Sequence, residues 1–298
     1  MVAKKDLIID VDTGIDDALA LILSYKKAQY KILGITTSGG NVGILKTTRN
    51  TLGIVSLLGA DMSVYRGAEK PLKRDSYILA EDYHGENGLC NIELVTDKAE
   101  ETMSAVEFIV SRLKSAKFPV TIIGLAPPTN IARAIEKDQS IVKNIETLYL
   151  MGGAVKVPGN QTPKAEFNFY QDPEAVNIIF KHVPNVHIIP LDVTNKCLIE
   201  KSDVEDFTPK NKVETFFKNA VLNWYKFFGT PKKRKFELYD PLAVSPILGN
   251  FLRFEQVSVR VNTTDNPGAI EEGPSSIFYA DKVDADSFKN FFLESLRF

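Results

Sequence analysis

The stretch Leu7-Ile8-Ile9-Asp10-Val11-Asp12-Thr13-Gly14-Ile15-Asp16-Asp17 gathers four carboxylates around one glycine, where an apolar strand ends and a helix begins. Unpaired buried charge is strongly unfavourable, so such a cluster shifts its pKa values, pairs with cations or coordinates a metal. No Lys or Arg lies between Lys5 and Lys26. The stretch therefore predicts a site for a hard, oxygen-preferring cation, and with it a catalytic site.

Short apolar runs rich in Ile and Val recur along the chain and predict the strands of a parallel sheet. They span residues 7–11, 32–37, 120–125, 148–151 and 186–193. Continuous rather than alternating hydrophobicity is typical of strands buried on both faces. Segments with apolar residues at helical spacing lie between them, around 18–23 and 106–113. We therefore expect an α/β fold with a Rossmann-like, open and mostly parallel sheet, helices on both faces, and a single domain over residues 1–298.

The later part of the chain has a different texture. A helix is expected from Val213, and it carries Phe216, Phe217, Val221, Trp224, Tyr225 and Phe228. The basic run Lys232-Lys233-Arg234-Lys235 that follows is interpreted as a solvated loop. A further helix is expected over 240–248 and a strand over 254–261. Ligands of open α/β sheets bind outside the carboxyl ends of the strands, which is where the aspartate cluster lies.

Composition excludes several classes of protein. The chain has 298 residues, 44% hydrophobic and 25% charged, with a net charge of -2, so no broad polyanion-binding face and no nucleic-acid partner is expected. Cys90 and Cys197 have no spacing suited to zinc or to a disulfide framework, which favours a reducing cytoplasm. No signal-peptide core and no apolar run of membrane-spanning length is visible, so we expect a soluble cytoplasmic protein with no membrane partner.

The aspartate stretch, extended to Ala18, closely resembles the DxDPGxDDAxA signature of the nucleoside hydrolases, the inosine-uridine preferring N-ribohydrolase family. Thr13 stands where proline is usual. Further motifs resemble the family in order and spacing: Thr36-Thr37-Ser38-Gly39-Gly40-Asn41, His84-Gly85-Glu86-Asn87-Gly88, Pro128-Thr129-Asn130-Ile131-Ala132, Met151-Gly152-Gly153, Glu166-Phe167-Asn168, Asp172-Pro173-Glu174-Ala175 and Asp240-Pro241-Leu242-Ala243. The resemblance implies the nucleoside hydrolase fold over almost the whole chain.

The resemblance also implies roles for individual residues. Asp12, Asp17, Asp240 and the main-chain carbonyl of Thr129 would hold Ca²⁺, with Asp10 in support, and Asp12 would be the general base. The ribose would be bound by Asp16, Asn41, Met151, Asn160, Glu166, Phe167 and Asn168. A strand-like segment would put Glu166 and Asn168 on one face, whereas a polar surface loop is the alternative. Helix capping alone would explain at most two of the four clustered aspartates.

The leaving-group side of the site departs from the family pattern. Tyr239 stands where many members carry His, and it is either a proton donor to the departing base or an aromatic wall of the pocket. His84 is the second candidate, because its loop matches one that closes over the nucleobase. Trp224 and Tyr225 are expected in either the base pocket or the core, with Tyr225 the better pocket candidate.

The expected function is Ca²⁺-dependent hydrolysis of the N-glycosidic bond of ribonucleosides, with inosine and uridine favoured and free base and ribose as products. A homo-oligomer, either tetramer or dimer, is expected from the resemblance. Two alternatives stay open. One is a phosphatase of the haloacid-dehalogenase type, which Asp10-Val11-Asp12-Thr13-Gly14 partly imitates, and the other is a catalytically weak nucleoside- or ribose-binding protein.

Overall fold

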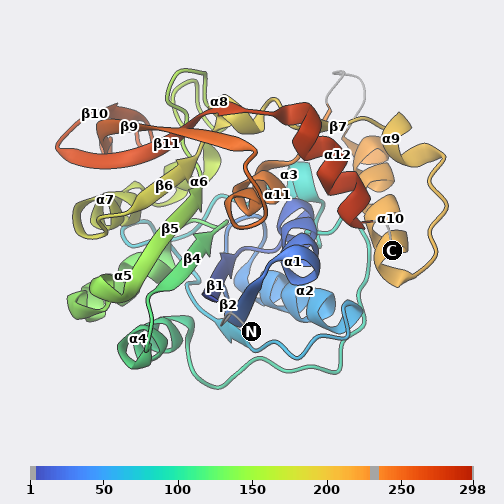
Figure 1. Cartoon of the computed structure of the whole chain (residues 1–298), viewed down its shortest axis with the longest axis horizontal. Helices are drawn as coiled ribbons and strands as arrows, with labels where there is room; N and C mark the ends of the chain where they lie inside the picture. Colours follow the sequence, from blue (N-terminus) through green and yellow to red (C-terminus); the bar gives the residue numbers. More distant parts are fainter. Residues whose placement is uncertain (1–4, 229–234, 297–298) are drawn as a thin grey trace.

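Within residues 5–228 and 235–296, which the computed structural model describes, one sheet of nine strands runs through the molecule (Figure 1). Its strands are β1 (Lys5–Val11), β2 (Tyr30–Thr37), β3 (Val64–Arg66), β4 (Val120–Gly124), β5 (Ile145–Met151), β6 (Val186–Ile189), β9 (Leu252–Val261), β10 (Ile270–Glu272) and β11 (Ser275–Val283). A separate antiparallel pair consists of β7 (Leu198–Ile199) and β8 (Phe236–Glu237).

The order of strands across the sheet is β10-β9-β11-β6-β5-β4-β1-β2-β3. Pairing is parallel from β11 to β3, and β9 runs antiparallel to both β11 and β10. The chain moves outward in one direction from β1 to β3 and in the other from β4 to β6. Between β1 and β4 the connections therefore diverge, which opens a crevice at the carboxyl ends of these two strands. The predicted α/β class and mostly parallel sheet are confirmed.

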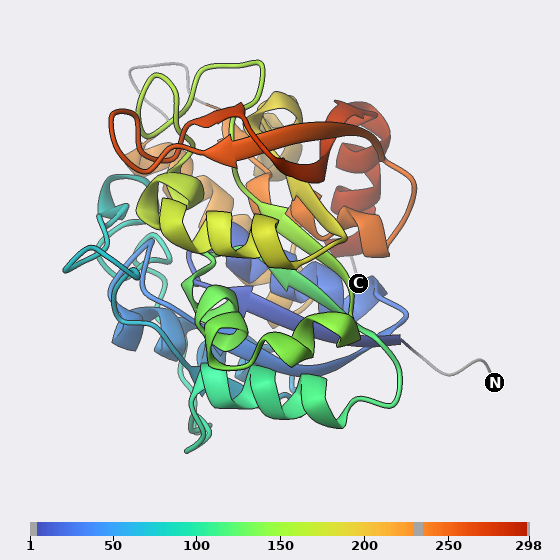
Figure 2. The same ribbon diagram turned by 90° about the vertical axis from the view of Figure 1, so that its left-hand side faces the viewer.

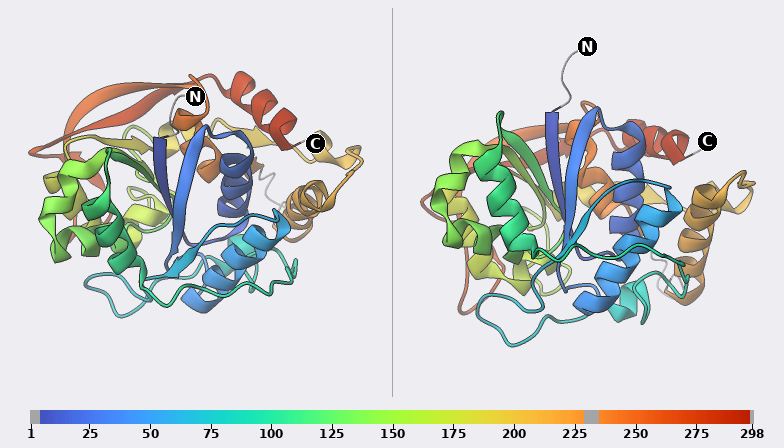
Figure 3. Two further views of the ribbon diagram at one scale, coloured as in Figure 1. Left: turned by 60° about the horizontal axis from the view of Figure 1, so that its bottom comes forward. Right: turned by 90° about the horizontal axis from the view of Figure 1, so that it is seen from below.

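Helices cover both faces of the sheet (Figures 2 and 3). The longer ones are α1 (Ile15–Lys27), α2 (Ile44–Leu57), α4 (Ala105–Ser115), α5 (Thr129–Lys137), α7 (Pro173–His182), α10 (Lys212–Phe227) and α12 (Ala285–Leu296). The shorter ones are α3 (Glu81–His84), η1 (Gln139–Asn144), α6 (Phe167–Gln171), α8 (Leu191–Thr194), α9 (Ser202–Glu205), α11 (Tyr239–Ala243) and η2 (Ser245–Ile247). No helix of this part of the chain combines the length and apolarity that a membrane span requires.

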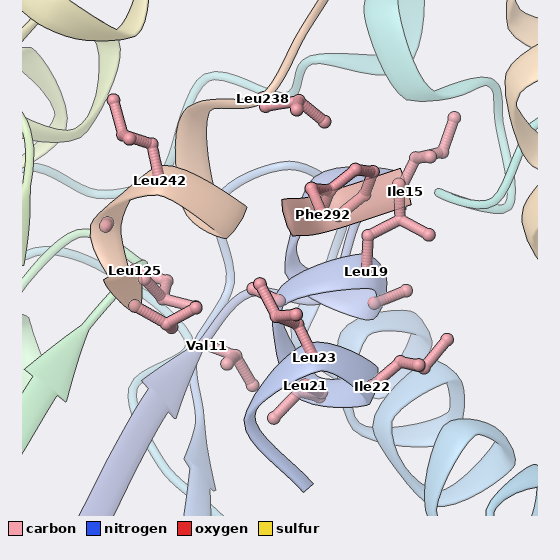
Figure 4. Packing of buried hydrophobic residues seen from close by; sticks show 14 of the residues in the cluster. Val11, Ile15, Leu19, Leu21, Ile22, Leu23, Leu125, Leu238, Leu242 and Phe292 are labelled. Carbon is pink, nitrogen blue, oxygen red and sulfur yellow. The ribbon is translucent and has the colours of Figure 1, made fainter. Parts of the chain in front are cut away.

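The alternation of side chains along β1 divides the core into two clusters. Leu7, Ile9 and Val11 pack with α1 and the C-terminal helices, whereas Ile8 packs with α4, α5 and α7 on the other face. Figure 4 shows the first cluster, in which Val11 and Leu125 lie beside residues of α1. Both faces of β1 are thus buried, which explains its unbroken apolar run and fixes the position of the aspartate turn that follows.

Two local predictions are wrong in extent or type. The strand expected over 186–193 ends at Ile189, because Pro190 has no N–H for the ladder and α8 begins immediately after it. The helix expected over 240–248 is divided into α11 and η2, because Pro246 cannot continue an α-helix. Of the basic run, Lys232, Lys233 and Arg234 lie outside the described residues, and Lys235 is exposed and pairs with Glu200 at 2.6 Å.

Candidate active site

The turn between β1 and α1 is built around the Asp17 carboxylate. Its Oδ1 accepts a hydrogen bond from the Asp12 backbone N–H at 3.2 Å, and its Oδ2 accepts from the Gly14 N–H at 2.9 Å. A carboxylate near a helix N-terminus satisfies free amides and the helix dipole. Gly14 is needed here, because a Cβ would lie 2.4 Å from Nδ1 of His84. Helix capping thus accounts for Asp17 but for none of the other acids.

Asp16, Asp17 and Asp240 meet at this turn, and their carboxylate oxygens lie within 4.8 Å of one another. All three are buried, and burial together with mutual repulsion raises the pKa of Asp16 and Asp240 well above the usual range. The pKa of Asp17 rises to about 6. Asp16 Oδ1 has no hydrogen-bond partner in the described part of the chain. Crowded, oxygen-only donors with an orphaned atom fit a hard divalent cation, so this cluster is a possible metal site.

Asp12 lies next to the cluster. Its Oδ2 accepts from the Asn41 backbone N–H at 2.7 Å, and the Asn41 side-chain amide donates to Asp17 Oδ2 at 3.0 Å. The backbone of Gly40 approaches so closely that a Cβ there would overlap Asp12 Oδ2 at 2.0 Å. Burial, then the charge of Asp17, raises the pKa of Asp12. Asn41 therefore fixes both carboxylates relative to each other.

Asp10 and Thr129 support the turn from behind. Asp10 Oδ1 accepts from the Thr36 hydroxyl at 2.6 Å and from the Asn130 amide at 2.8 Å, and burial raises its pKa to about 7. The Thr129 hydroxyl donates to Asp172 Oδ2 at 2.7 Å and accepts from the Tyr77 hydroxyl at 2.8 Å. Because its hydroxyl is fully engaged, Thr129 could serve a metal only through its main-chain carbonyl.

The cluster lies at one side of a cavity of about 350 Å³, a volume typical of small-molecule sites. The predicted residues that line it are Asp12, Asp16, Asn41, His84, Met151, Asn160, Glu166, Phe167, Asn168, Tyr239 and Asp240. The predicted residues that do not line it are Asp10, Asp17, Thr129, Trp224 and Tyr225. The structure thus brings together side chains from the ends of β1, β2 and β5 with others from α3, α6 and α11.

Glu166 and Asn168 face the cavity, but the expected strand-like segment is wrong. Glu166 is the N-cap of α6, and its carboxylate accepts from the N–H groups of Asn168 and Phe169 at 2.8 and 3.1 Å and from that of Gly153 at 3.0 Å. The Asn168 amide donates to the carbonyls of Leu125 and Met151 at 2.7 and 3.2 Å. Capping geometry, rather than strand alternation, therefore aims this polar pair into the cavity.

Comparison with known proteins shows which family the chain belongs to. The sequence model of the family described as inosine-uridine preferring nucleoside hydrolase matches residues 7–290. The chain belongs to this family. It is therefore a nucleoside hydrolase, an enzyme that cleaves N-glycosidic bonds.

Individual relatives differ in the bases that their names specify. A pyrimidine-specific ribonucleoside hydrolase RihA from Citrobacter koseri is 36% identical over 247 residues, which is 81% of this chain and 78% of the relative. The RihA of Shewanella woodyi is 41% identical over 202 residues, 67% of this chain and 64% of the relative. The structure of a purine-preferring ribonucleoside hydrolase from Gardnerella vaginalis superposes with a TM-score of 0.91 at 29% identity, covering 98% of both chains.

The His84 imidazole of this nucleoside hydrolase is held neutral. It is buried against the aspartate turn, and its Nδ1 accepts a hydrogen bond from the Ile15 backbone N–H at 3.2 Å. Burial lowers the pKa of His84 to about 3. Because Nδ1 is an acceptor, the ring proton of the neutral form resides on Nε2. His84 can therefore donate a hydrogen bond, but it is not an imidazolium acid at neutral pH.

Tyr239 lines the cavity and remains a phenol. Burial, then the charge of Glu237, raises the pKa of Tyr239 far above its usual range, while a hydrogen bond with the Asn160 side chain opposes that rise. Asn160 Oδ1 in turn accepts from the Phe167 N–H at 2.9 Å. The phenol is thus oriented at the cavity wall, where both predicted roles of Tyr239, donor and wall, are geometrically available.

Of the two alternatives for Trp224 and Tyr225, base pocket or core, the structure has the core, because neither residue lines the cavity. Trp224 is fully buried and packs edge-on against Tyr83, with ring centroids 5.4 Å apart. The Tyr225 hydroxyl donates to the Ile199 carbonyl at 2.6 Å, which turns the side chain toward β7. Both aromatic residues therefore support the cavity from outside it.

Several lining residues were not predicted from the sequence. They are Leu79, Ala80, Asp82, Tyr83, Leu125, Gln161 and Glu237. Tyr83 and Glu237 are neighbours of His84 and Tyr239 in the chain, and that proximity was the available signal. Their contact across the cavity depends on the tertiary fold, because Tyr83 and Glu237 lie 154 positions apart in the chain.

Proposed function

We propose that this nucleoside hydrolase uses Ca²⁺ to hydrolyse ribonucleosides to a free base and ribose, with uridine and inosine among its substrates. The observation that carries the proposal is the juxtaposition of an all-carboxylate cluster with a cavity of about 350 Å³. Asp17, Asp240, Asp12 and the Thr129 carbonyl would hold the ion, with Asp10 in support. An oxygen-only donor set favours Ca²⁺ or Mg²⁺ over zinc, and an irregular set of donors favours Ca²⁺.

The ribose would lie at the acidic side of the cavity. Ca²⁺ held there supplies an anchor for sugar hydroxyls and lowers the pKa of a nearby water. Asp16, Asn41, Glu166 and Asn168 present acceptors and donors to the hydroxyls, with Met151 and Phe167 as apolar contacts and Asn160 toward the 5′-hydroxyl. Asn41 and the Gly153 N–H fix these groups before substrate arrives, so orientation costs little at the moment of reaction.

Hydrolysis requires a new bond from water to C1′ and cleavage of the bond from C1′ to the base. Asp12 would accept the proton of the attacking water, since its Oδ2 is fixed by the Asn41 N–H. Positive charge develops on the ribose in such a transition state, and the surrounding carboxylates stabilise it. The base leaves with the bonding electron pair, and Tyr239 would donate a hydrogen bond to it, with the His84 Nε2–H as the second donor.

Residues of the cavity argue against the phosphatase alternative. Asp10, which would be the nucleophile of a haloacid-dehalogenase type enzyme, does not line the cavity and is fully buried behind it. Among the described lining residues there is no Lys or Arg to bind a phosphate. A carboxylate-rich cavity without a cation favours a neutral nucleoside over a phosphorylated sugar.

The test is ribose release from inosine, uridine, cytidine, adenosine and guanosine by the purified chain with Ca²⁺. Asp12→Asn should abolish release. Asp138→Asn is the matched control, because Asp138 is a half-buried aspartate outside the cavity that pairs with Lys114 at 2.7 Å. Micromolar nucleoside binding without turnover would instead select the binding-protein alternative. Homo-oligomerisation as a tetramer or dimer and a cytoplasmic location stay predictions, and light scattering of the purified chain tests the first.

A further inference from the structure

Glu237 is an acidic residue of the cavity that the proposed chemistry does not use. It ends β8, two residues before Tyr239, and its half-buried side chain lines the cavity. It belongs neither to the carboxylate cluster nor to the residues assigned to the ribose. A carboxylate accepts hydrogen bonds and donates none, so a ligand group beside it is favoured when it carries N–H or O–H donors.

Tyr83 positions the Glu237 carboxylate from the opposite element. The Tyr83 hydroxyl donates a hydrogen bond to Glu237 Oε2 at 3.0 Å. The Tyr83 ring is itself supported by the buried ring of Trp224, at 5.4 Å between centroids. An ionised carboxylate has about four acceptor sites, so it can accept from more than one donor at a time. The carboxylate is therefore oriented as well as accessible to the cavity.

Glu237 belongs to the side of the cavity where the base must lie. Asp12, Glu166 and Asn168 occupy the ribose side, so the base extends toward the walls formed by α3 and by residues 237–239. Tyr239, two residues away, is the proposed donor to the departing base. The charge of Glu237 acts on both Tyr239 and Asp16, which agrees with its position inside the site.

We propose that Glu237, positioned by Tyr83, is a specificity-determining residue that selects bases with an exocyclic amino group, and so favours cytidine over uridine. This inference rests on the proposed nucleoside hydrolysis. Cytosine carries an amino group where uracil carries a carbonyl oxygen. A carboxylate accepts a hydrogen bond from the amino group of cytosine and repels the carbonyl oxygen of uracil, so the two bases differ in their interaction with Glu237. The N3–H of uracil is a weaker match, because carbonyl oxygens flank it on both sides.

The test is the ratio of kcat/KM for cytidine to that for uridine, measured on the full chain with Ca²⁺. Wild type should favour cytidine by about tenfold or more, the ratio equivalent to 1.4 kcal/mol. Glu237→Gln keeps an acceptor for Tyr83 but offers an N–H₂ donor to the uracil carbonyl, so the ratio should fall by about tenfold or more. Tyr83→Phe should lower the ratio less, because the carboxylate remains.

Glu255→Gln is a matched control, because Glu255 Oε2 accepts from the Tyr279 hydroxyl at the same 3.0 Å, away from the cavity. It should leave the ratio unchanged. A ratio in Glu237→Gln within twofold of wild type, or one that moves toward cytidine, would overturn the assignment.

Calorimetric titration with cytidine and uridine separates this inference from the proposed function. If wild type hydrolyses neither nucleoside, the proposed activity is wrong, while the ratio of the two dissociation constants still tests Glu237. Tighter binding of cytidine that Glu237→Gln removes supports the inference. Equal binding of both nucleosides, or binding of neither, overturns it.

Discussion

Thr129→Val isolates the hydrogen bonds that fix the turn after β4. Valine matches threonine in shape but has no hydroxyl, and Thr129 is completely buried. The substitution removes the 2.7 Å bond to Asp172 and the 2.8 Å bond from Tyr77. A hydrogen bond to a charged group contributes about 1.5–3 kcal/mol and a neutral one about 1 kcal/mol. Asp172 Oδ2 keeps its bond from the Leu72 N–H at 2.9 Å, so we expect a loss of about 3 kcal/mol in the free energy of unfolding.

The assay is urea unfolding in the presence of a chelator, so that metal binding does not contribute to stability. Thr48→Val is the control, because the Thr48 hydroxyl is also buried and makes one neutral bond, to the Thr37 hydroxyl at 2.8 Å. It should cost about 1 kcal/mol. A Thr129→Val loss no larger than that of Thr48→Val would refute the argument that the Asp172 and Tyr77 bonds fix this turn.

The same variant also tests the Thr129 carbonyl as a proposed ligand. Calorimetric titration with Ca²⁺ should show weaker binding in Thr129→Val than in Thr48→Val, because a loosened turn holds its carbonyl less precisely. Equal Ca²⁺ affinity in the two variants would argue that the turn does not contribute to the ion's site.

Three further predictions concern the site directly. Removal of divalent ions should abolish ribose release, and Ca²⁺ should restore it. Bound Ca²⁺ should also stabilise the fold, because it relieves repulsion among Asp16, Asp17 and Asp240. At about 100 times its dissociation constant, Ca²⁺ should raise the free energy of unfolding in urea by about 2.7 kcal/mol. Asp12→Asn should lower kcat by about 10²–10⁴-fold with little change in stability. A loss in kcat no larger than that of the control Asp138→Asn would exclude Asp12 as the general base. Tyr239→Phe should lower kcat by about tenfold or more if the phenol donates to the leaving base, and a change confined to KM would make it only a wall.

Prediction from sequence succeeded where the signal is local. The apolar run before Asp10 and the helix after Gly14 specify β1, the turn and α1 within one segment, because strand burial and helix capping act over a few residues. Errors arose where a proline interrupts a regular pattern, as at Pro190 and Pro246. They also arose where a cap was mistaken for a strand, as at Glu166.

The sequence by itself determined the α/β class, the aspartate turn and the order of the family motifs. Tertiary structure decided what those residues meet. It brings Asp240 to Asp17, buries Trp224 behind Tyr83 and holds His84 neutral against the Ile15 N–H. These outcomes depend on distances and desolvation between segments far apart in the chain, which no local pattern encodes. The acidic half of the cavity was therefore predictable, whereas the Tyr83 and Glu237 contact opposite it was not.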